Sequence, residues 1–257
     1  MSAPGTSPRF SGLPAVMLAL TVVLAVALVA MIGGELYARH RAKTLVAEAV
    51  TCETQDSAQV SFGTTPPVLT QYFTDAYSHI SVKTAGNQIR QAKGMRLALD
   101  IRDVRLNKDA KNSATPDSKG TIGSVDGTIT WPAEGIKDSI QDVVPVIGSI
   151  VTGSVTADPD AGTVQLKGLL NKATVKPQLV NNGLSLQVTE LELLGRDLDR
   201  DSVQRNLDEL TAKVTDDLPL GIHLDTVGVT DSGVQVTFST RNATIPASSS
   251  RECFASL

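Results

Sequence analysis

The side chains that most often do chemistry in proteins are few in this sequence and lie far apart along it. The histidines are His40, His79 and His223, and the cysteines are Cys52 and Cys253. His79 and His223 stand among alternating apolar residues, where a structural histidine is more common than a metal ligand. Zinc needs several such ligands at characteristic spacings, so we expect no zinc site. We also find no glycine-rich phosphate loop and no nucleophile elbow.

Residues 197–208, DLDRDSVQRNLD, come closest to a metal-binding motif. They place four aspartates at positions 1, 3, 5 and 12 of a calcium-binding loop. However, Ser202 stands where the sharp turn requires glycine, and Asp208 stands where a bidentate glutamate is usual. The same carboxylates suit a helix N-terminus, where the helix dipole favours negative charge. We therefore expect no metal and no cofactor, and without acids or bases in a catalytic frame we expect no enzyme.

The two cysteines bracket the region that follows the N-terminal segment. An even pair at the two ends of an exported domain is typical of a disulfide. Closing a loop of about 200 residues would contribute roughly 4–5 kcal/mol in the chain-entropy model. We predict a Cys52–Cys253 disulfide, with two unrelated thiols as the alternative.

Residues 13–32, LPAVMLALTVVLAVALVAMI, form an uncharged and largely apolar run. As a helix rising ~1.5 Å per residue it would span ~30 Å, the thickness of a bilayer core. The run is longer than the apolar core of a signal peptide, and its one small-x-small site, at 25–27, lies inside it. We predict a cytoplasmic tail at 1–12 and an uncleaved transmembrane anchor at 13–34, with a cleaved signal peptide as the alternative.

Charge gives conflicting indications of orientation. Arg9 precedes the apolar run, whereas Arg39, Arg41 and Lys43 follow it. The positive-inside rule alone would place the C-terminal part in the cytoplasm. The short tail, the export-like apolar run and the cysteine pair favour the opposite orientation. We predict a single-pass protein of the cell membrane with an extracytoplasmic C-terminal domain. Because this domain is acidic and has no basic stripe with interleaved aromatics, we expect no nucleic-acid partner.

The rest of the chain alternates strand-like runs with amphipathic helices. Residues 35–50 contain no glycine or proline and predict a helical stalk, and residues 51–257 predict one domain. Helices are expected at 64–77, after Trp131, and at 201–218. Short turn signals between the strand-like runs indicate mostly antiparallel pairing. The first two helices each have an apolar face: Leu69, Tyr72, Phe73 and Ala76 in one, and Ile136, Ile140, Val143, Val144 and Ile147 in the other.

Three strand-like runs share an unusual spacing of apolar residues. In LALDIRDVRL, residues 97–106, the intervals are two, two, three and two, and residues 184–193 and 220–229 repeat them. An extra residue in a strand is typical of a β-bulge, which bends the strand and then restores the same face. Three such bends predict a strongly curved sheet. Chance is the alternative, since 41% of the residues are hydrophobic.

The order of these parts resembles the LmeA-like family of actinobacterial phospholipid-binding cell-envelope proteins, which includes mycobacterial members. The similarity covers most of residues 35–257 and rests on TTPPVLTQYFTDAYSHISV at 64–82, on LALDIRDVRL, and on TITWPAEGI at 128–136. It implies an exported phospholipid-binding protein with a curved sheet similar to tubular lipid-binding domains. It also implies a connection with the elongation of lipoglycan mannan, and it brings no catalytic residues.

These observations predict an α+β fold with a strongly curved, mostly antiparallel sheet and amphipathic helices after a transmembrane helix. The expected function is membrane-anchored, extracytoplasmic phospholipid binding in cell-envelope lipid or lipoglycan biogenesis. The alternative is a non-catalytic structural or assembly protein that binds another envelope protein through exposed strand edges. Acyl chains are expected between the sheet and two helix faces, and ordinary core packing is the alternative for each candidate residue. These candidates are Leu69, Phe73, Ile136, Ile140, Val143 and Ile147.

Overall fold

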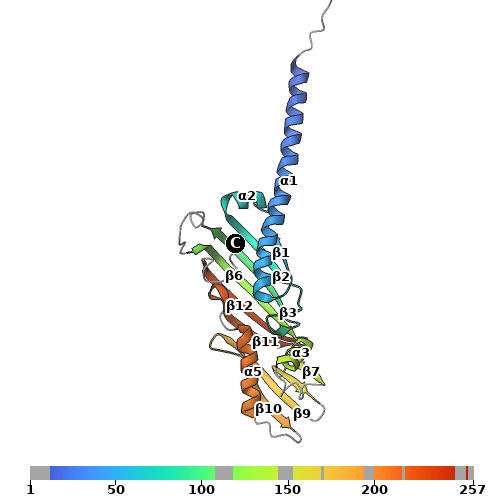
Figure 1. The fold of residues 1–257 in the computed structure, drawn as a ribbon, viewed down its shortest axis with the longest axis vertical. Helices are drawn as coiled ribbons and strands as arrows, with labels where there is room; N and C mark the ends of the chain where they lie inside the picture. Colours follow the sequence, from blue (N-terminus) through green and yellow to red (C-terminus); the bar gives the residue numbers. More distant parts are fainter. Residues whose placement is uncertain are drawn as a thin grey trace, which may run out of the picture.

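A helix of 43 residues, α1 (Gly12–Thr54), opens the computed structural model and projects from a body of antiparallel sheets (Figure 1). The structure describes residues 12–107, 118–143, 153–168, 171–193, 200–215, 218–246 and Cys253. The α+β architecture agrees with the sequence prediction.

The two halves of α1 lie in different surroundings. Residues 16–32 are exposed and apolar, and the helix is long and apolar enough to cross a membrane. This fits a membrane anchor or a signal sequence. Further along, Ala38, Ala42 and Ala49 are buried against the body. The segment 35–50, predicted as a stalk, therefore belongs to the same helix and packs against the sheet.

The larger sheet has six strands, and every neighbouring pair is antiparallel. A small hairpin, β3 (Gln88–Ile89) and β4 (Ala92–Lys93), connects two of its strands. The strand order across the larger sheet is β1 (Ala58–Phe62), β2 (Ala76–Thr84), β5 (Arg96–Leu106), β6 (Ser118–Pro132), β12 (Gly233–Pro246) and β11 (His223–Thr230).

The second sheet is antiparallel as well and has the order β10-β9-β8-β7. A helix, α5 (Arg200–Thr215), packs on β10, and α3 (Ala133–Val143) lies near β7 and β4. A short helix, α2 (Val68–Thr74), contacts α1, and a 3-10 turn, η2 (Pro219–Gly221), precedes β11. The strands of this sheet are β7 (Ser154–Asp158), β8 (Thr163–Lys167), β9 (Asn171–Val180) and β10 (Gly183–Leu193).

The body contains two apolar cores. One surrounds Trp131 and includes the inner faces of α3, α5 and the second sheet. Its residues Val203, Leu207 and Leu210 recur at intervals of three and four and form the buried face of α5. The other core joins α1 to the strands β1, β2, β5, β6 and β12.

The predicted bulges are present in β10 and β11. The pairing register shifts between Val188 and Glu190 in β10, and between Leu224 and Thr226 in β11. Each shift lies at the three-residue interval in the apolar pattern, so these two predictions are confirmed. The strong curvature inferred from such bends remains a prediction.

In β5 the irregular position is Asp103, but the register does not shift there. Arg102 and Val104 pair with Ser124 and Ile122 of β6 at one constant offset, and Asp103 lies between these pairs with a φ of 55°. The neighbouring strands skip a residue at the same level: Ser78 in β2, Gly123 in β6 and Asn242 in β12. The register is preserved because all four strands take the same three-residue step. The sequence predicts an extra residue in β5 alone. The structure instead has a line of irregular positions across four strands.

The disulfide prediction is also confirmed. Cys52, near the end of α1, is bonded to Cys253, and their Cα atoms are 5.4 Å apart. The bond closes a sequence separation of 201 residues and fixes Cys253 against the end of α1.

Candidate functional site

An apolar cavity lies between the second half of α1 and one face of the six-stranded sheet. Its volume is about 270 Å³, and its lining comes from both apolar cores. The side chains of the two cores therefore leave an unfilled space between them. Protein interiors are normally packed to crystal density, so a void of this size marks a candidate binding site.

The helical wall of the cavity is formed by one face of α1. The lining residues recur at intervals of three and four, which places them on one side of the helix. Alanines at two of these positions leave room between the helix and the sheet. The residues are Ala42, Leu45, Val46, Ala49, Val50, Glu53 and Thr54.

The opposite wall includes all five apolar residues of the β5 pattern. Leu97, Leu99 and Ile101 line the cavity before the irregular position, and Val104 and Leu106 line it afterwards. In a regular strand side chains alternate between faces, so Val104 would point away from the face of Ile101. The three-residue step at Asp103 turns it back. The irregularity thus extends one apolar surface along the whole strand.

The neighbouring strands extend this surface by the same step. Tyr77 and Ile80 of β2 and Ile122 and Val125 of β6 are each three residues apart, and all four line the cavity. The segment leading into β11 contributes a further apolar group, comprising Leu218, Leu220, Ile222 and Leu224.

Polar side chains line only a small part of the cavity. Glu53 and Arg90 form an ion pair with 3.5 Å between Oε2 and Nη2, and Thr54 and Thr215 also contribute to the lining. Tyr77 is half-buried elsewhere in the wall, where desolvation first and the nearby Asp75 charge second raise the pKa of its phenol. The phenol therefore stays neutral at physiological pH. The cavity is suited to an apolar chain with one polar end.

Asp56, just after α1, fixes the end of the helical wall to the segment between β2 and β3. Its carboxylate accepts hydrogen bonds from the backbone N–H groups of Gly86 and Asn87, at 2.7 and 3.0 Å, and from the Asn87 side chain at 2.8 Å. Burial would by itself raise the pKa of Asp56, but these hydrogen bonds and one from the Ser57 N–H lower it below its ordinary value. The buried carboxylate is therefore held in its charged form.

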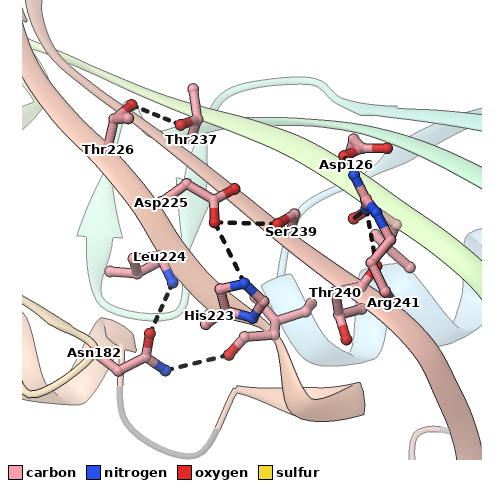
Figure 2. A network of polar contacts seen from close by, with 12 residues as sticks. Asp126, Asn182, His223, Leu224, Asp225, Thr226, Thr237, Ser239, Thr240 and Arg241 are labelled. Carbon is pink, nitrogen blue, oxygen red and sulfur yellow. Dashed lines mark hydrogen bonds and ion pairs between the residues drawn. The ribbon is translucent and has the colours of Figure 1, made fainter.

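The opposite face of the six-stranded sheet is polar (Figure 2). Arg241 of β12 pairs with Asp126 of β6 at 2.6 Å, and Asp225, the bulged residue of β11, accepts a hydrogen bond from Ser239 at 3.1 Å. Asn182, in the turn between β9 and β10, accepts from the Leu224 N–H at 2.9 Å. The polar contacts therefore lie on one face of the sheet and the apolar cavity on the other, facing α1.

None of the described candidate side chains lines the cavity. Ile136 and Ile140 are buried in the core around Trp131, and Leu69 packs against the core that joins α1 to the sheet. Phe73 is exposed. Val143 ends α3, but its side chain lies outside the described part, as does Ile147. The candidate set therefore remains a prediction, and the structure does not bring its members together.

The apolar face expected for the first helix is not the face that α2 buries. The buried residues of α2 are Val68 and Gln71, whereas Tyr72 and Phe73 are exposed. Gln71 is buried because its amide donates to the Gly63 and Pro66 carbonyls and accepts from the Ser78 N–H. A side chain that meets these backbone groups displaces the aromatic residues from the interior.

Within the described ranges, no three histidine, cysteine or acidic side chains gather as a metal site would require. His79 instead pairs with Asp100 at 2.8 Å, and Arg102 donates to the other oxygen of the same carboxylate. His223 pairs with Asp225 at 3.4 Å. Both histidines lie on the polar side of the sheet, where each contacts the carboxylate of a strand residue.

Comparison with known proteins decides the family. A model of LmeA-like phospholipid-binding proteins matches residues 29–239. The chain belongs to this family. The match begins within the apolar part of α1 and includes the helical wall and the strands around the cavity, except the second half of β12. It therefore bears out the resemblance inferred from the sequence, with phospholipid as the ligand class of the LmeA-like family.

Relatives of this LmeA-like chain occur in mycobacteria. Uncharacterized proteins of Mycobacterium bovis and of two strains of Mycobacterium tuberculosis are each 50% identical to it over 239 residues. The alignment covers 93% of this chain and 67% of each relative. No solved structure matches the chain.

Proposed function

We propose that this protein binds a phospholipid with part of an acyl chain in the cavity between α1 and the six-stranded sheet. The single observation that supports this most is the continuous apolar lining of a cavity in a member of a phospholipid-binding family. The assembly alternative predicts a filled interior, so an open cavity favours lipid binding over it.

The size of the cavity limits how much lipid it holds in this conformation. At about 30 Å³ per water-sized group, 270 Å³ holds about nine methylene groups. Their transfer from water contributes about 7 kcal/mol at ~0.8 kcal/mol each, before the costs of binding. The cavity thus suits a segment of one acyl chain, and a whole two-chain lipid requires either an opening of α1 or an exposed second chain.

The polar part of the lining gives the lipid a direction. The Glu53–Arg90 ion pair and Thr215 offer a charged and hydroxyl-bearing end, where a headgroup would find hydrogen-bond partners. Arg90 suits a phosphate, since a guanidinium donates several N–H groups in a planar fork. Lipid phosphate would then compete with Glu53 for Arg90.

We further propose that α1 anchors the protein in the cell membrane and that the domain lies outside the cytoplasm. The Cys52–Cys253 disulfide supports this, because disulfides persist in oxidising compartments. In this position the protein acts without catalysis in cell-envelope lipid or lipoglycan biogenesis, and another envelope protein would act as donor or acceptor of the lipid.

The test is extraction of the purified full chain with organic solvent, followed by mass spectrometry. The proposal expects phospholipid at a fixed molar ratio that persists after the protein is passed through lipid-free detergent. Substitution of Ile101 by Asp, which puts a charge in the cavity wall, should remove that lipid. Absence of retained phospholipid, or equal retention by a folded Ile101→Asp variant, would refute it.

A further inference from the structure

Exposed apolar side chains are concentrated at one end of the body. Outside residues 16–32, the described part has five large hydrophobic side chains in the exposed class. Four belong to the junction of α1 and α2, and only Val180 lies in the second sheet. The four are Leu36 at 63%, Tyr37 at 73%, Tyr72 at 49% and Phe73 at 69% exposed. We call these four residues the junction patch.

The junction patch lies where the predicted transmembrane segment ends. Residue 34 is the last of that segment, and Glu35 is the first charged residue after it. Leu36 and Tyr37 follow within the same turn of α1. Figure 1 shows α2 at the end of the body from which α1 projects, so the helix that carries Tyr72 and Phe73 is near the level at which α1 would leave a bilayer.

Glu35 fastens α2 to α1 at this level. One carboxylate oxygen accepts from the Val68 N–H at 3.0 Å and the other from the Leu69 N–H at 2.7 Å. Arg39 donates to the same carboxylate at 2.9 Å. Gly34 leaves the Leu69 side chain room to approach, since an added Cβ would stand 3.2 Å from it. The short helix therefore has a fixed position relative to α1.

The chemistry of the patch is that of a membrane interface. Tyr72 and Phe73 are in edge-to-face contact, with ring centroids 5.9 Å apart. Tyrosines are enriched at the headgroup level because their rings combine an apolar body with a polar tip. A patch exposed to water would leave four large apolar side chains hydrated, and contact with lipid removes that cost.

We propose that the junction patch is a membrane-docking surface, and that α2 inserts Tyr72 and Phe73 into the headgroup region of the bilayer that α1 crosses. The inference rests on the proposed anchoring by α1 and adds a second contact with the same membrane. That contact fixes the tilt of the body against the bilayer. A second copy of the chain or an envelope protein is the competing occupant of the patch.

Fluorescence quenching in vesicles tests the proposal with the full chain. The chain has one tryptophan, Trp131, which is buried and provides a constant background. A Phe73→Trp variant is reconstituted into phosphatidylcholine–phosphatidylglycerol vesicles with or without bromine on the acyl chains. The matched control is Val180→Trp, at the exposed apolar residue of the second sheet.

For side chains inserted 5–10 Å into the interface, the emission added by Phe73→Trp should fall by about half in the brominated vesicles. The emission of Val180→Trp should not change, and Glu35→Ala combined with Phe73→Trp should lose most of the quenching because α2 is released.

Equal quenching of the two tryptophan variants, or protection of Phe73→Trp from water only at high protein density, would overturn the proposal. The folded Ile101→Asp variant should keep the quenching, which separates a failure of this inference from a failure of lipid binding in the cavity.

Discussion

Filling the cavity from the α1 side should weaken lipid binding without harming the fold. Ala49 lines the cavity and is 3% exposed. The substitution Ala49→Leu adds three carbon atoms, or about 90 Å³ at about 30 Å³ each. This is one third of the 270 Å³ available. The variant therefore removes the space for about three methylene groups of the ligand.

The expected loss of affinity follows from that volume. At ~0.8 kcal/mol per methylene, the variant loses about 2.4 kcal/mol of binding free energy, which is about a 60-fold rise in Kd. The free protein should be as stable as the parent or more stable, because leucine fills an apolar void and leucine and alanine are both good helix formers. Weaker binding together with undiminished stability is the distinguishing result.

The assay is a fluorescence titration of the full chain in detergent with a phospholipid that carries a pyrene-labelled acyl chain. Thermal unfolding of each variant is measured in parallel. Glu48→Leu is the matched control, since it places the same side chain on an exposed position of the same helix. The reasoning is refuted if folded Ala49→Leu binds the lipid as tightly as the parent, or if Glu48→Leu weakens binding equally.

Three further predictions concern stability, measured by denaturant unfolding. Replacing Cys52 and Cys253 by serine should lower the free energy of unfolding by about 5 kcal/mol in the chain-entropy model, and reduction of the parent should have the same effect; a loss near zero would contradict this. Asp56→Asn should cost about 1–3 kcal/mol at pH 7, because a group with a depressed folded pKa stabilises above its unfolded pKa. This difference should shrink as pH falls below about 4, and a difference independent of pH would contradict the role of the charge. Asp103→Val should cost about 1–2 kcal/mol because a β-branched residue opposes a φ of 55°, whereas Asp103→Gly should be near neutral; equal effects would show that backbone conformation is not the cause.

The period slip in 97–106 shows what an apolar pattern can predict. Alternation assigns faces, and the interval of three correctly indicated that Ile101 and Val104 face the same side. The pattern of one strand could not indicate that β2, β6 and β12 take the same step. That requires the pairing register, which depends on contacts distant in sequence. Because one strand's pattern does not give the pairing register, the sequence predicts an extra residue in β5 alone, whereas four strands share the irregularity.

The assignment of α2 was limited by its length. A helix of seven residues makes two turns, so apolar spacing hardly distinguishes its faces. Gln71 is buried for hydrogen bonds to the loop before α2 and to β2, and no apolar scale would select it. The sequence therefore does not predict that Tyr72 and Phe73 are exposed. Their exposure is seen only once α2 is placed beside α1, near the end of its apolar segment.

The apolar face of α1 that lines the cavity can be predicted from the sequence. Residues 42–54 place apolar side chains at helical intervals on one face, which is the signal of a helix packed against a body. Its continuity with the predicted transmembrane segment favours a stalk instead. The disulfide was easier to predict, since two cysteines allow only one pairing.

The most direct test of the central claim is photo-crosslinking with a phospholipid that carries a diazirine on an acyl chain. The full chain is labelled in vesicles, and crosslinked peptides beyond residue 34 are identified by mass spectrometry. The account predicts labels on the lining residues of α1 at 42–54 and of β5 at 97–106, with loss of both in Ile101→Asp. Labels confined to α3 and α5, or absent beyond residue 34, would contradict it.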